Sequence, residues 1–299
     1  MLVQKNNGNA LISLYADGTR YIEYEGTLEL AEPLNIDIRV MTKCAFGKNP
    51  LTGKAVCSFC HESATTNGVE CDYNELKEHL SELSPGVELA IGANEITDGL
   101  IEFLGWAKDR GFISNITINQ MRIRSDHQLV KKLIDDDYIK GLGISYRKMD
   151  WNIPEDILNY ENTVFHVILG IDTIGEVREL RKRGVKKILC LGEKDFGFNK
   201  GNVNLKRIEH RNWYWWISKL MNEFDVVSFD NLAIQQLNLK RLFNQETWEE
   251  FDNGEHSMYI NAVEGYYSPS SRSDVKVMWN DSKLLDFFKK NEENLFEPK

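Results

Sequence analysis

The chain has 299 residues, 42% of them hydrophobic, which is enough for one large α/β domain with an appendage. Its 46 acidic residues outnumber its 36 basic residues and give a net charge of -10, which disfavours a nucleic-acid polymer as substrate because the field repels phosphates. No apolar run approaches the ~20 residues that span a bilayer and no export signal opens the chain, so we expect a cytoplasmic protein with no membrane partner.

The first 30 residues predict a small β-hairpin appendage. Residues 10–24, ALISLYADGTRYIEY, alternate apolar and polar side chains on both sides of a short turn. This alternation is typical of two antiparallel strands joined by a tight turn. We therefore treat residues 1–30 as a unit of their own.

Residues 36–200 predict alternating strands and helices. Six strand-like runs are separated by stretches with helical periodicity: IDIRVMT, VELAI, ISNITIN, IKGLGIS, TVFHVIL and VKKILCL. Strands that alternate with helices of this length form βαβ units with a parallel sheet. Beyond residue 200 the periodicity is less regular, and we expect residues 201–299 to form an α+β extension.

Polar or glycine residues stand where each of the six strands ends. In chain order they are Cys44, 92–95, Asn119, Ser145, Gly170 and 192–195. Open sheets and barrels share the alternation of strands and helices, but in βα barrels function concentrates at the rim where the strands end. The pattern therefore favours a barrel whose rim carries the site.

Three of the five cysteines, Cys44, Cys57 and Cys60, lie in one loop after the first strand, CAFGKNPLTGKAVCSFC. The number of cysteines is odd and three of them are clustered. This fits a metal site in a protein of a reducing compartment better than a set of disulfides. Thiolates are the usual ligands of iron-sulfur clusters, and a set of three leaves one iron of a 4Fe-4S cluster open for chemistry. Tetrahedral zinc, completed by His61 or Cys71, is the alternative that the spacing leaves open.

Phe59 stands between the last two cysteines as C-S-F-C, and this arrangement resembles the cluster loop of radical S-adenosylmethionine (radical SAM) enzymes. The commoner family spacing has three residues between the first two cysteines, where this chain has twelve. The resemblance covers residues 36–200. It implies a partial (β/α)6 TIM-like barrel of the radical SAM type, which the C-terminal extension would close.

The resemblance also implies a reaction class. Radical SAM enzymes reductively cleave S-adenosylmethionine at a single 4Fe-4S cluster to a 5'-deoxyadenosyl radical, which abstracts hydrogen from the substrate. The implied cofactors are the 4Fe-4S cluster and S-adenosyl-L-methionine, and the implied electron donor is an external protein such as flavodoxin or ferredoxin. The acidic charge favours a small metabolite, nucleotide or peptide as the unidentified substrate. No catalytic residue is assigned.

Contacts with S-adenosylmethionine follow from the same resemblance. The segment from Gly92 to Glu95 is similar to the family's glycine-rich segment, in which a glutamate meets the methionine ammonium, although Ala93 and Asn94 replace the expected residues. A small residue is needed where backbone nears a ligand. The other implied contacts are Asn119 and Ser145 with the ribose or the methionine carboxylate, and Phe59, Gly170 and Ile171 beside the adenine.

Each of these residues also has a structural alternative. Glu95 suits a helix N-terminus, where the helix dipole favours a carboxylate. Asn119 and Ser145 are common turn residues at strand ends. His166, inside an apolar strand, is expected to be a core histidine rather than a ligand. Candidates for a substrate pocket at the same rim are Arg147, Lys194 and Asp195.

Two other classes of function remain open. A zinc-binding structural or interaction protein on a βα scaffold would use the same cysteines, and it would be colourless and independent of reductant. A metal-free hydrolase or lyase would use Glu95 as its base, and it would keep its activity after the cysteines were replaced.

Overall fold

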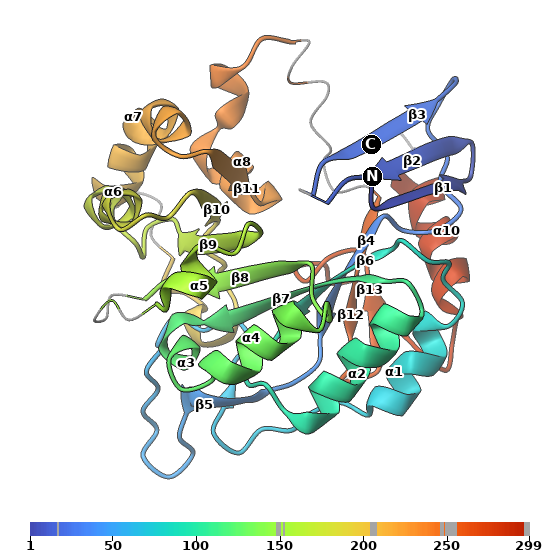
Figure 1. Ribbon diagram of the computed structural model, residues 1–299, viewed down its shortest axis with the longest axis horizontal. Helices are drawn as coiled ribbons and strands as arrows, with labels where there is room; N and C mark the ends of the chain where they lie inside the picture. The colour runs from blue at the N-terminus through green and yellow to red at the C-terminus, as the bar shows by residue number, and fades with distance from the viewer. Residues whose placement is uncertain are drawn as a thin grey trace.

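The structure is a computed structural model, shown in Figure 1, and it describes residues 1–16, 18–147, 151, 153–203, 208–245, 248 and 256–295. Two sheets form its framework. One is a three-stranded antiparallel sheet at the N-terminus, and the other is a ten-stranded sheet that is mostly parallel. The residues predicted to carry function belong to the larger sheet and its loops.

The N-terminal sheet consists of β1 (Val3–Asn7), β2 (Ala10–Leu14) and β3 (Arg20–Tyr24). The predicted hairpin is present, because β2 and β3 pair antiparallel, and β1 adds a strand to the other edge of β2. Arg20 forms an ion pair with Glu88 of the large sheet. Buried Ala10 and Ile12 join the main hydrophobic core, so this sheet is packed against the rest of the molecule.

All six strands predicted between residues 36 and 200 are present, and they pair in parallel. They are β4 (Asn35–Arg39), β6 (Glu88–Gly92), β7 (Ile113–Asn119), β8 (Gly141–Ser145), β9 (Thr163–Ile168) and β10 (Lys187–Leu191). Because they run in the same direction, their carboxyl ends meet at one edge of the sheet, where open α/β sheets bind ligands.

Residues beyond 200 contribute four more strands to the same sheet. They are β11 (Val226–Phe229), β12 (Ser257–Asn261), β13 (Tyr266–Ser268) and β14 (Val277–Met278). β11 pairs in parallel with β10, and β12 pairs in parallel with β4. β13 and β14 continue from β12 as antiparallel strands.

The expected partial (β/α)6 barrel is wrong. The strand order is β11-β10-β9-β8-β7-β6-β4-β12-β13-β14, and in the described residues it does not close on itself. A strand has two hydrogen-bonding edges, and closure of the six-stranded set would need β10 to approach β4. The outer edge of β10 is taken by β11 and that of β4 by β12, so the sheet stays open.

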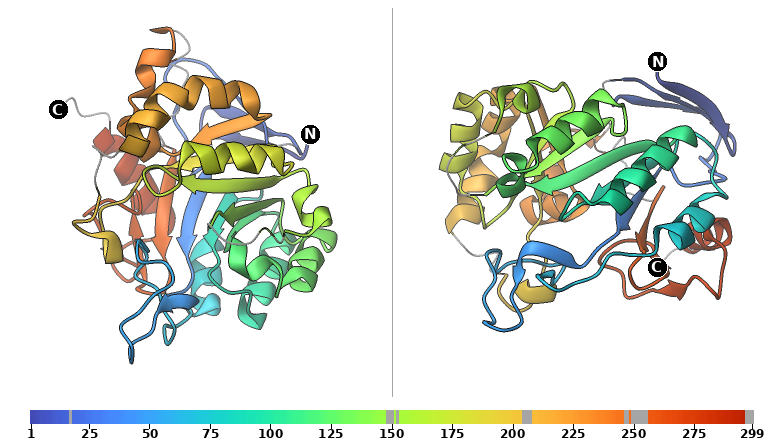
Figure 2. Two further views of the ribbon diagram at one scale, coloured as in Figure 1. Left: turned by 90° about the vertical axis from the view of Figure 1, so that its left-hand side faces the viewer. Right: turned by 60° about the horizontal axis from the view of Figure 1, so that its bottom comes forward.

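Helices connect the parallel strands, and α1, α2 and α4 lie together on one face of the sheet (Figures 1 and 2). The helices are α1 (Tyr73–Leu80), α2 (Asp98–Asp109), α3 (Gln120–Ile123), α4 (His127–Asp135), α5 (Glu155–Leu158), α6 (Ile174–Lys182), α7 (Ile208–Glu223), α8 (Asn231–Leu237) and α10 (Leu284–Leu295), with the 3-10 turns η1 (Gly197–Asn199) and η2 (Leu239–Leu242). Within the described ranges, none of these helices is both long and apolar enough to cross a membrane.

Side chains at the helix starts explain where several helices begin. Asp72 accepts hydrogen bonds from the first turn of α1, and Thr97 does the same for α2. Thr173 and Glu176 form a reciprocal capping box at the start of α6. These caps lie in the loops that follow the carboxyl ends of the strands, so they also fix the backbone around the site.

The two faces of the large sheet differ in burial. On the face that we call the covered face, apolar side chains are buried: Ile36, Ile38, Leu89, Ile91, Ile116, Ile118, Leu142, Ile144, Phe165, Val167, Ile188 and Cys190. On the opposite face, the open face, Asp37 and Gly92 are exposed although they lie on central strands. Ala90, Thr117 and His166 are half-buried there.

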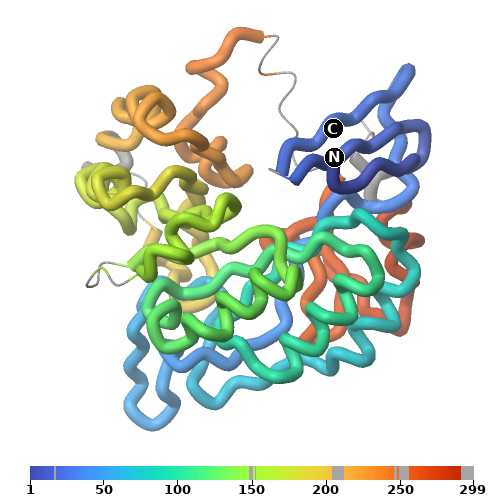
Figure 3. Tube along the Cα trace, in the orientation of Figure 1, coloured from blue at the N-terminus to red at the C-terminus, as the bar shows by residue number. Residues whose placement is uncertain are grey.

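The chain between β4 and α1 makes a long excursion beyond the carboxyl edge of the sheet. It contains β5 (Lys43–Lys48), which belongs to neither sheet and bridges to Thr65. We call residues 43–61 the cysteine loop. Its tip projects away from the sheet in Figure 3, and Leu51 at this tip is 94% exposed.

Candidate functional site

The three cysteines of the loop lie near one another as free thiols. Cys44 lies on β5, and a turn links the other two, because the Cys60 N–H donates to the Cys57 carbonyl at 3.2 Å. Cys57 is buried and the other two are half-buried. Burial raises the pKa of Cys44 and Cys60, and the neighbouring cysteine thiols raise it further, so all three lie within electrostatic range.

The segment after β10 supports the loop. Gly197 has a φ of +62°, and a Cβ there would lie 2.1 Å from the carbonyl oxygen of His61. The next residue, Phe198, donates its N–H to the Cys60 carbonyl at 3.0 Å. Only glycine combines this left-handed backbone with so close an approach. The turn η1 therefore supports the backbone of the third cysteine.

The two residues considered as a fourth zinc ligand have other partners. Cys71 packs in the hydrophobic core, where burial raises the pKa of its thiol to about 12. His61 Nε2 lies 3.0 Å from a Glu62 carboxylate oxygen and 3.5 Å from Lys194 Nζ. Among the residues that the structure describes, no group of three or more His, Cys, Asp or Glu side chains is arranged to hold a metal ion. The loop offers three free thiols, but the structure does not arrange them as a metal site.

One small pocket brings together Phe59, Ile171 and Lys194, which the sequence indicated separately. Its volume is about 50 Å³, and it lies between the cysteine loop and the ends of β9 and β10. Its lining residues are Phe59, His61, Ile168, Ile171, Leu191, Gly192, Glu193, Lys194 and Asn199. The Arg147 guanidinium lies 4.9 Å from the centre of the Phe59 ring, in a cation–π contact. Arg147, which the sequence indicated as a substrate-pocket candidate, therefore contacts a residue that lines this pocket.

Asn119 and Ser145 stand opposite each other at the ends of β7 and β8. The Asn119 amide nitrogen lies 3.9 Å from the sulfur of Cys57, as a hydrogen-bond donor. Its carbonyl oxygen accepts from the N–H of Met121 at 3.0 Å and caps α3. Asn119 thus serves both as a turn residue and as a contact to a cysteine, while half-buried Ser145 lies next to it on the same edge.

The segment after β6 approaches Cys44. Glu95 lies 3.5 Å from Lys43 Nζ, and its charge acts on the Cys44 thiol. Thr97, not Glu95, caps α2. Ala93 is buried and donates its N–H to the sheet at 2.9 Å, whereas Gly92 is exposed, and a Cβ built on it would meet nothing within 4 Å. Of this segment, Glu95 acts on the Cys44 thiol and Gly92 lies exposed on the open face of β6.

The turn after β9 is held by hydrogen bonds. Gly170 has a φ of +77°, and the Ile171 N–H donates to the Ile168 carbonyl at 3.2 Å. The Asp172 carboxylate accepts from the Ile168 N–H at 2.6 Å, and its carbonyl accepts from the buried indole of Trp213 at 2.9 Å. This turn fixes Ile171 against the pocket.

A charged network that the sequence reasoning missed joins the cysteine loop to the sheet. Arg39, at the end of β4, lies 2.8 Å from the Glu62 carboxylate, and Lys194 approaches His61 and donates to Ser271 at 3.2 Å. Burial acts to raise the pKa of Glu62, but His61, Arg39 and Lys194 outweigh it and hold the pKa at about 2. The feature of the sequence that could have indicated this network is the pair His61-Glu62, which directly follows the third cysteine.

His166 and Asp195 differ from expectation. His166 lies half-buried on the open face rather than in the apolar core, with its ring over Gly143, where a Cβ would come within 2.7 Å of it. Burial lowers the pKa of His166 to about 4, and the charge of Arg147 acts in the same direction. Asp195 is exposed and accepts the Gly201 N–H at 2.6 Å, so it stabilises a turn.

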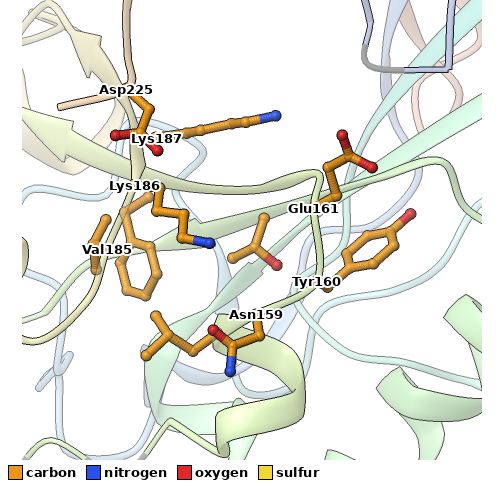
Figure 4. A pocket seen from close by; sticks show the side chains of 10 residues that line it. Asn159, Tyr160, Glu161, Val185, Lys186, Lys187 and Asp225 are labelled. Atoms are coloured by element: carbon orange, nitrogen blue, oxygen red, sulfur yellow. The ribbon is translucent and has the colours of Figure 1, made fainter.

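A second pocket, shown in Figure 4, lies at the opposite end of the strands. Its volume is about 280 Å³, and it is lined by Leu158, Asn159, Tyr160, Glu161, Thr163, Phe165, Val185, Lys186, Lys187 and Asp225. Thr163 and Lys187 begin β9 and β10, so this pocket is at the amino edge of the sheet. The residues that the sequence indicated lie at the carboxyl edge, and the larger pocket contains none of them.

Comparisons with known proteins add no relative. No protein-family model matches the chain, and no curated protein or solved structure matches it. Function is therefore inferred from the side chains and their geometry.

Proposed function

We propose that this protein is a radical SAM enzyme that holds a single 4Fe-4S cluster on Cys44, Cys57 and Cys60 and removes hydrogen from a small substrate. The observation that carries the proposal is the gathering of three free thiols of one loop at the carboxyl edge of a parallel sheet. Three thiolates leave one iron of such a cluster without a protein ligand. Ligands of open α/β sheets bind at this same edge.

Residues around the thiols support a bound cofactor there. Glu95 offers a carboxylate beside Cys44 for an ammonium group, and Asn119 offers an amide donor to Cys57. Phe59 and Ile171 offer apolar surface on the other side of the loop. When bound, the cluster and S-adenosylmethionine supply reductive cleavage to a 5'-deoxyadenosyl radical. The chain's own residues bind and orient these groups and exclude water from them.

Anaerobic reconstitution with iron and sulfide tests the proposal. We expect about four irons per chain, a broad visible absorbance, and 5'-deoxyadenosine after addition of dithionite and S-adenosylmethionine. An external flavodoxin or ferredoxin should replace dithionite. Stoichiometric zinc without iron uptake would contradict the proposal and favour the zinc-binding alternative.

Two cysteine variants make the test specific. Cys57→Ala should lose the iron and the visible absorbance while the far-ultraviolet circular dichroism spectrum stays unchanged. Cys71→Ala is the matched control, because Cys71 packs in the core, and this variant should keep its iron. Zinc held by the three loop cysteines and Cys71 would instead be lost in both variants.

A further inference from the structure

The open face contains a strip along β6 whose residues are exposed or half-buried. Asp37, Ala90 and Asn115 stand in one row across β4, β6 and β7, which are neighbours in the sheet (Figure 1). Arg39, Gly92 and Thr117 stand in a second row nearer the carboxyl edge, and the Arg39 guanidinium pairs with Glu62 and Glu264. We call Asp37, Ala90, Gly92, Asn115 and Thr117 the open strip. Its floor is Ala90 and Gly92, which carry no side chain beyond a methyl group.

Side chains on the β7 side of the strip leave this floor free. Asn115 and Thr117 lean away from it over β8, since a Cβ on Gly141 or Gly143 would lie 2.6 Å from their side-chain oxygens. A Cβ on Gly92 would meet nothing within 4 Å. Neighbouring strands are about 4.8 Å apart, so the Asp37 and Asn115 backbones are separated by roughly 10 Å, which is room for one flat ring.

Polar groups border the floor without a hydrogen bond to the protein. Among the described residues, the side chains of Asp37, Asn115 and Thr117 have no such bond. The Asp37 side chain is exposed, and desolvation by the surrounding protein raises the pKa of its carboxyl group. The charges that act on it are those of Lys194 and Asp230, and Lys194 is already engaged by Ser271 and His61.

We propose that the open strip binds a compact, flat, cationic small molecule, with its charged group on Asp37 and its opposite edge against Asn115 and Thr117. A flat floor suits a planar ring, and a planar cation pairs with a carboxylate through two parallel hydrogen bonds. The strip reaches the carboxyl edge at Gly92, next to the segment that brings Glu95 to Cys44. A molecule bound there is the substrate only if the proposed function holds, but its binding does not require the cluster.

Benzamidine and benzamide are the probes, because they have nearly the same shape and only benzamidine carries a positive charge. Isothermal titration calorimetry of the full chain should show saturable binding of benzamidine. Its dissociation constant should be at least tenfold lower than that of benzamide. Asp37→Asn should weaken benzamidine binding at least tenfold, and Ala90→Leu, which fills the floor, should weaken it as much. Asp135→Asn, an exposed carboxylate on α4, is the matched control and should bind as wild type does.

The outcomes separate this inference from the proposed function. Loss of the cluster in Cys57→Ala should leave benzamidine binding unchanged, and circular dichroism should confirm that every variant is folded. Equal affinity for the two probes, unchanged binding in Asp37→Asn, or no saturable binding of benzamidine would each overturn the inference. Saturable binding in a chain that takes up no iron would leave the inference standing and remove the proposed function.

Discussion

The covered and open faces of the large sheet belong to the same strands but differ in what lies against them. On β7, Ile116 and Ile118 are buried on the covered face, while Thr117 and Asn119 are half-buried on the other. Parallel sheets are usually covered on both faces, and their strands then carry continuous apolar runs. Alternation in a parallel strand therefore indicates a face that the fold leaves for another use.

This difference separates stability from function along a single strand. The covered face supplies the burial that holds the sheet together, because each buried aliphatic side chain contributes about 1.5–3 kcal/mol. The open face has polar side chains and small residues, and it leads to the cysteine loop at the carboxyl edge. We expect substitutions on the two faces to change different measurements.

The largest expected effect separates the neighbours Ile116 and Thr117. Ile116→Ala should lower the free energy of unfolding by about 2–5 kcal/mol, through lost burial and the cavity left behind. Thr117→Ala should change it by less than about 0.5 kcal/mol, because its side chain is half-buried on the open face and has no side-chain hydrogen bond to the described residues. Urea unfolding measures both, and equal losses would show that the two faces are packed alike.

The second prediction concerns the edge where the sheet meets the cysteine loop. Gly197 and Gly201 both have positive φ, at +62° and +75°, but only a Cβ on Gly197 would meet the loop. Gly201→Ala should cost about 1 kcal/mol of stability from backbone strain alone. Gly197→Ala should cost about 2–3 kcal/mol, because the His61 carbonyl must also move.

The same pair of variants distinguishes a local from a general effect. Iron bound per chain after reconstitution should fall in Gly197→Ala and stay unchanged in Gly201→Ala. An equal loss of iron in both variants would mean that the turn does not support the third cysteine specifically.

The third prediction uses the histidine of the open face. The pKa of His166 is lowered to about 4 in the folded chain from an ordinary value of 6.5, so between these values the unfolded chain binds more protons. Stability should therefore fall as the pH drops from about 6.5 towards 4, with a limiting slope of about 1.4 kcal/mol per pH unit from this residue. His166→Asn should lose that part of the slope in urea titrations, and identical pH profiles would contradict the assignment.

The smallest expected effect is on the reduction potential of the reconstituted protein. The Asn119 amide donates towards the Cys57 sulfur, and hydrogen bonds to cluster sulfurs stabilise the reduced, more negative state. Asn119→Leu should therefore shift the potential to a more negative value in a spectroelectrochemical titration. Ser145→Ala, on the adjacent strand end, is the control and should shift it less.

Several features of the site were predictable because they depend on short stretches of sequence. Cys57 and Cys60 are separated by one turn, so their proximity follows from the chain itself. Asn119 and Ser145 end neighbouring parallel strands, and such ends meet at one edge. The charged network of Arg39, Glu62 and Lys194 was not predictable, since it needs three segments from different parts of the chain to meet.

The sequence alone determined three features, because periodicity and strand propensity act locally. They are the six parallel strands, their order along the chain, and the grouping of polar residues at the strand ends. Whether the sheet closes was not determined by the sequence alone, since βα alternation suits both a barrel and an open sheet. The tertiary structure decided that the sheet stays open, because β11 and β12, from the C-terminal region, pair with the outer edges of β10 and β4. The open strip also depends on cross-strand register, which places Asp37, Ala90 and Asn115 in one row only after the chain has folded.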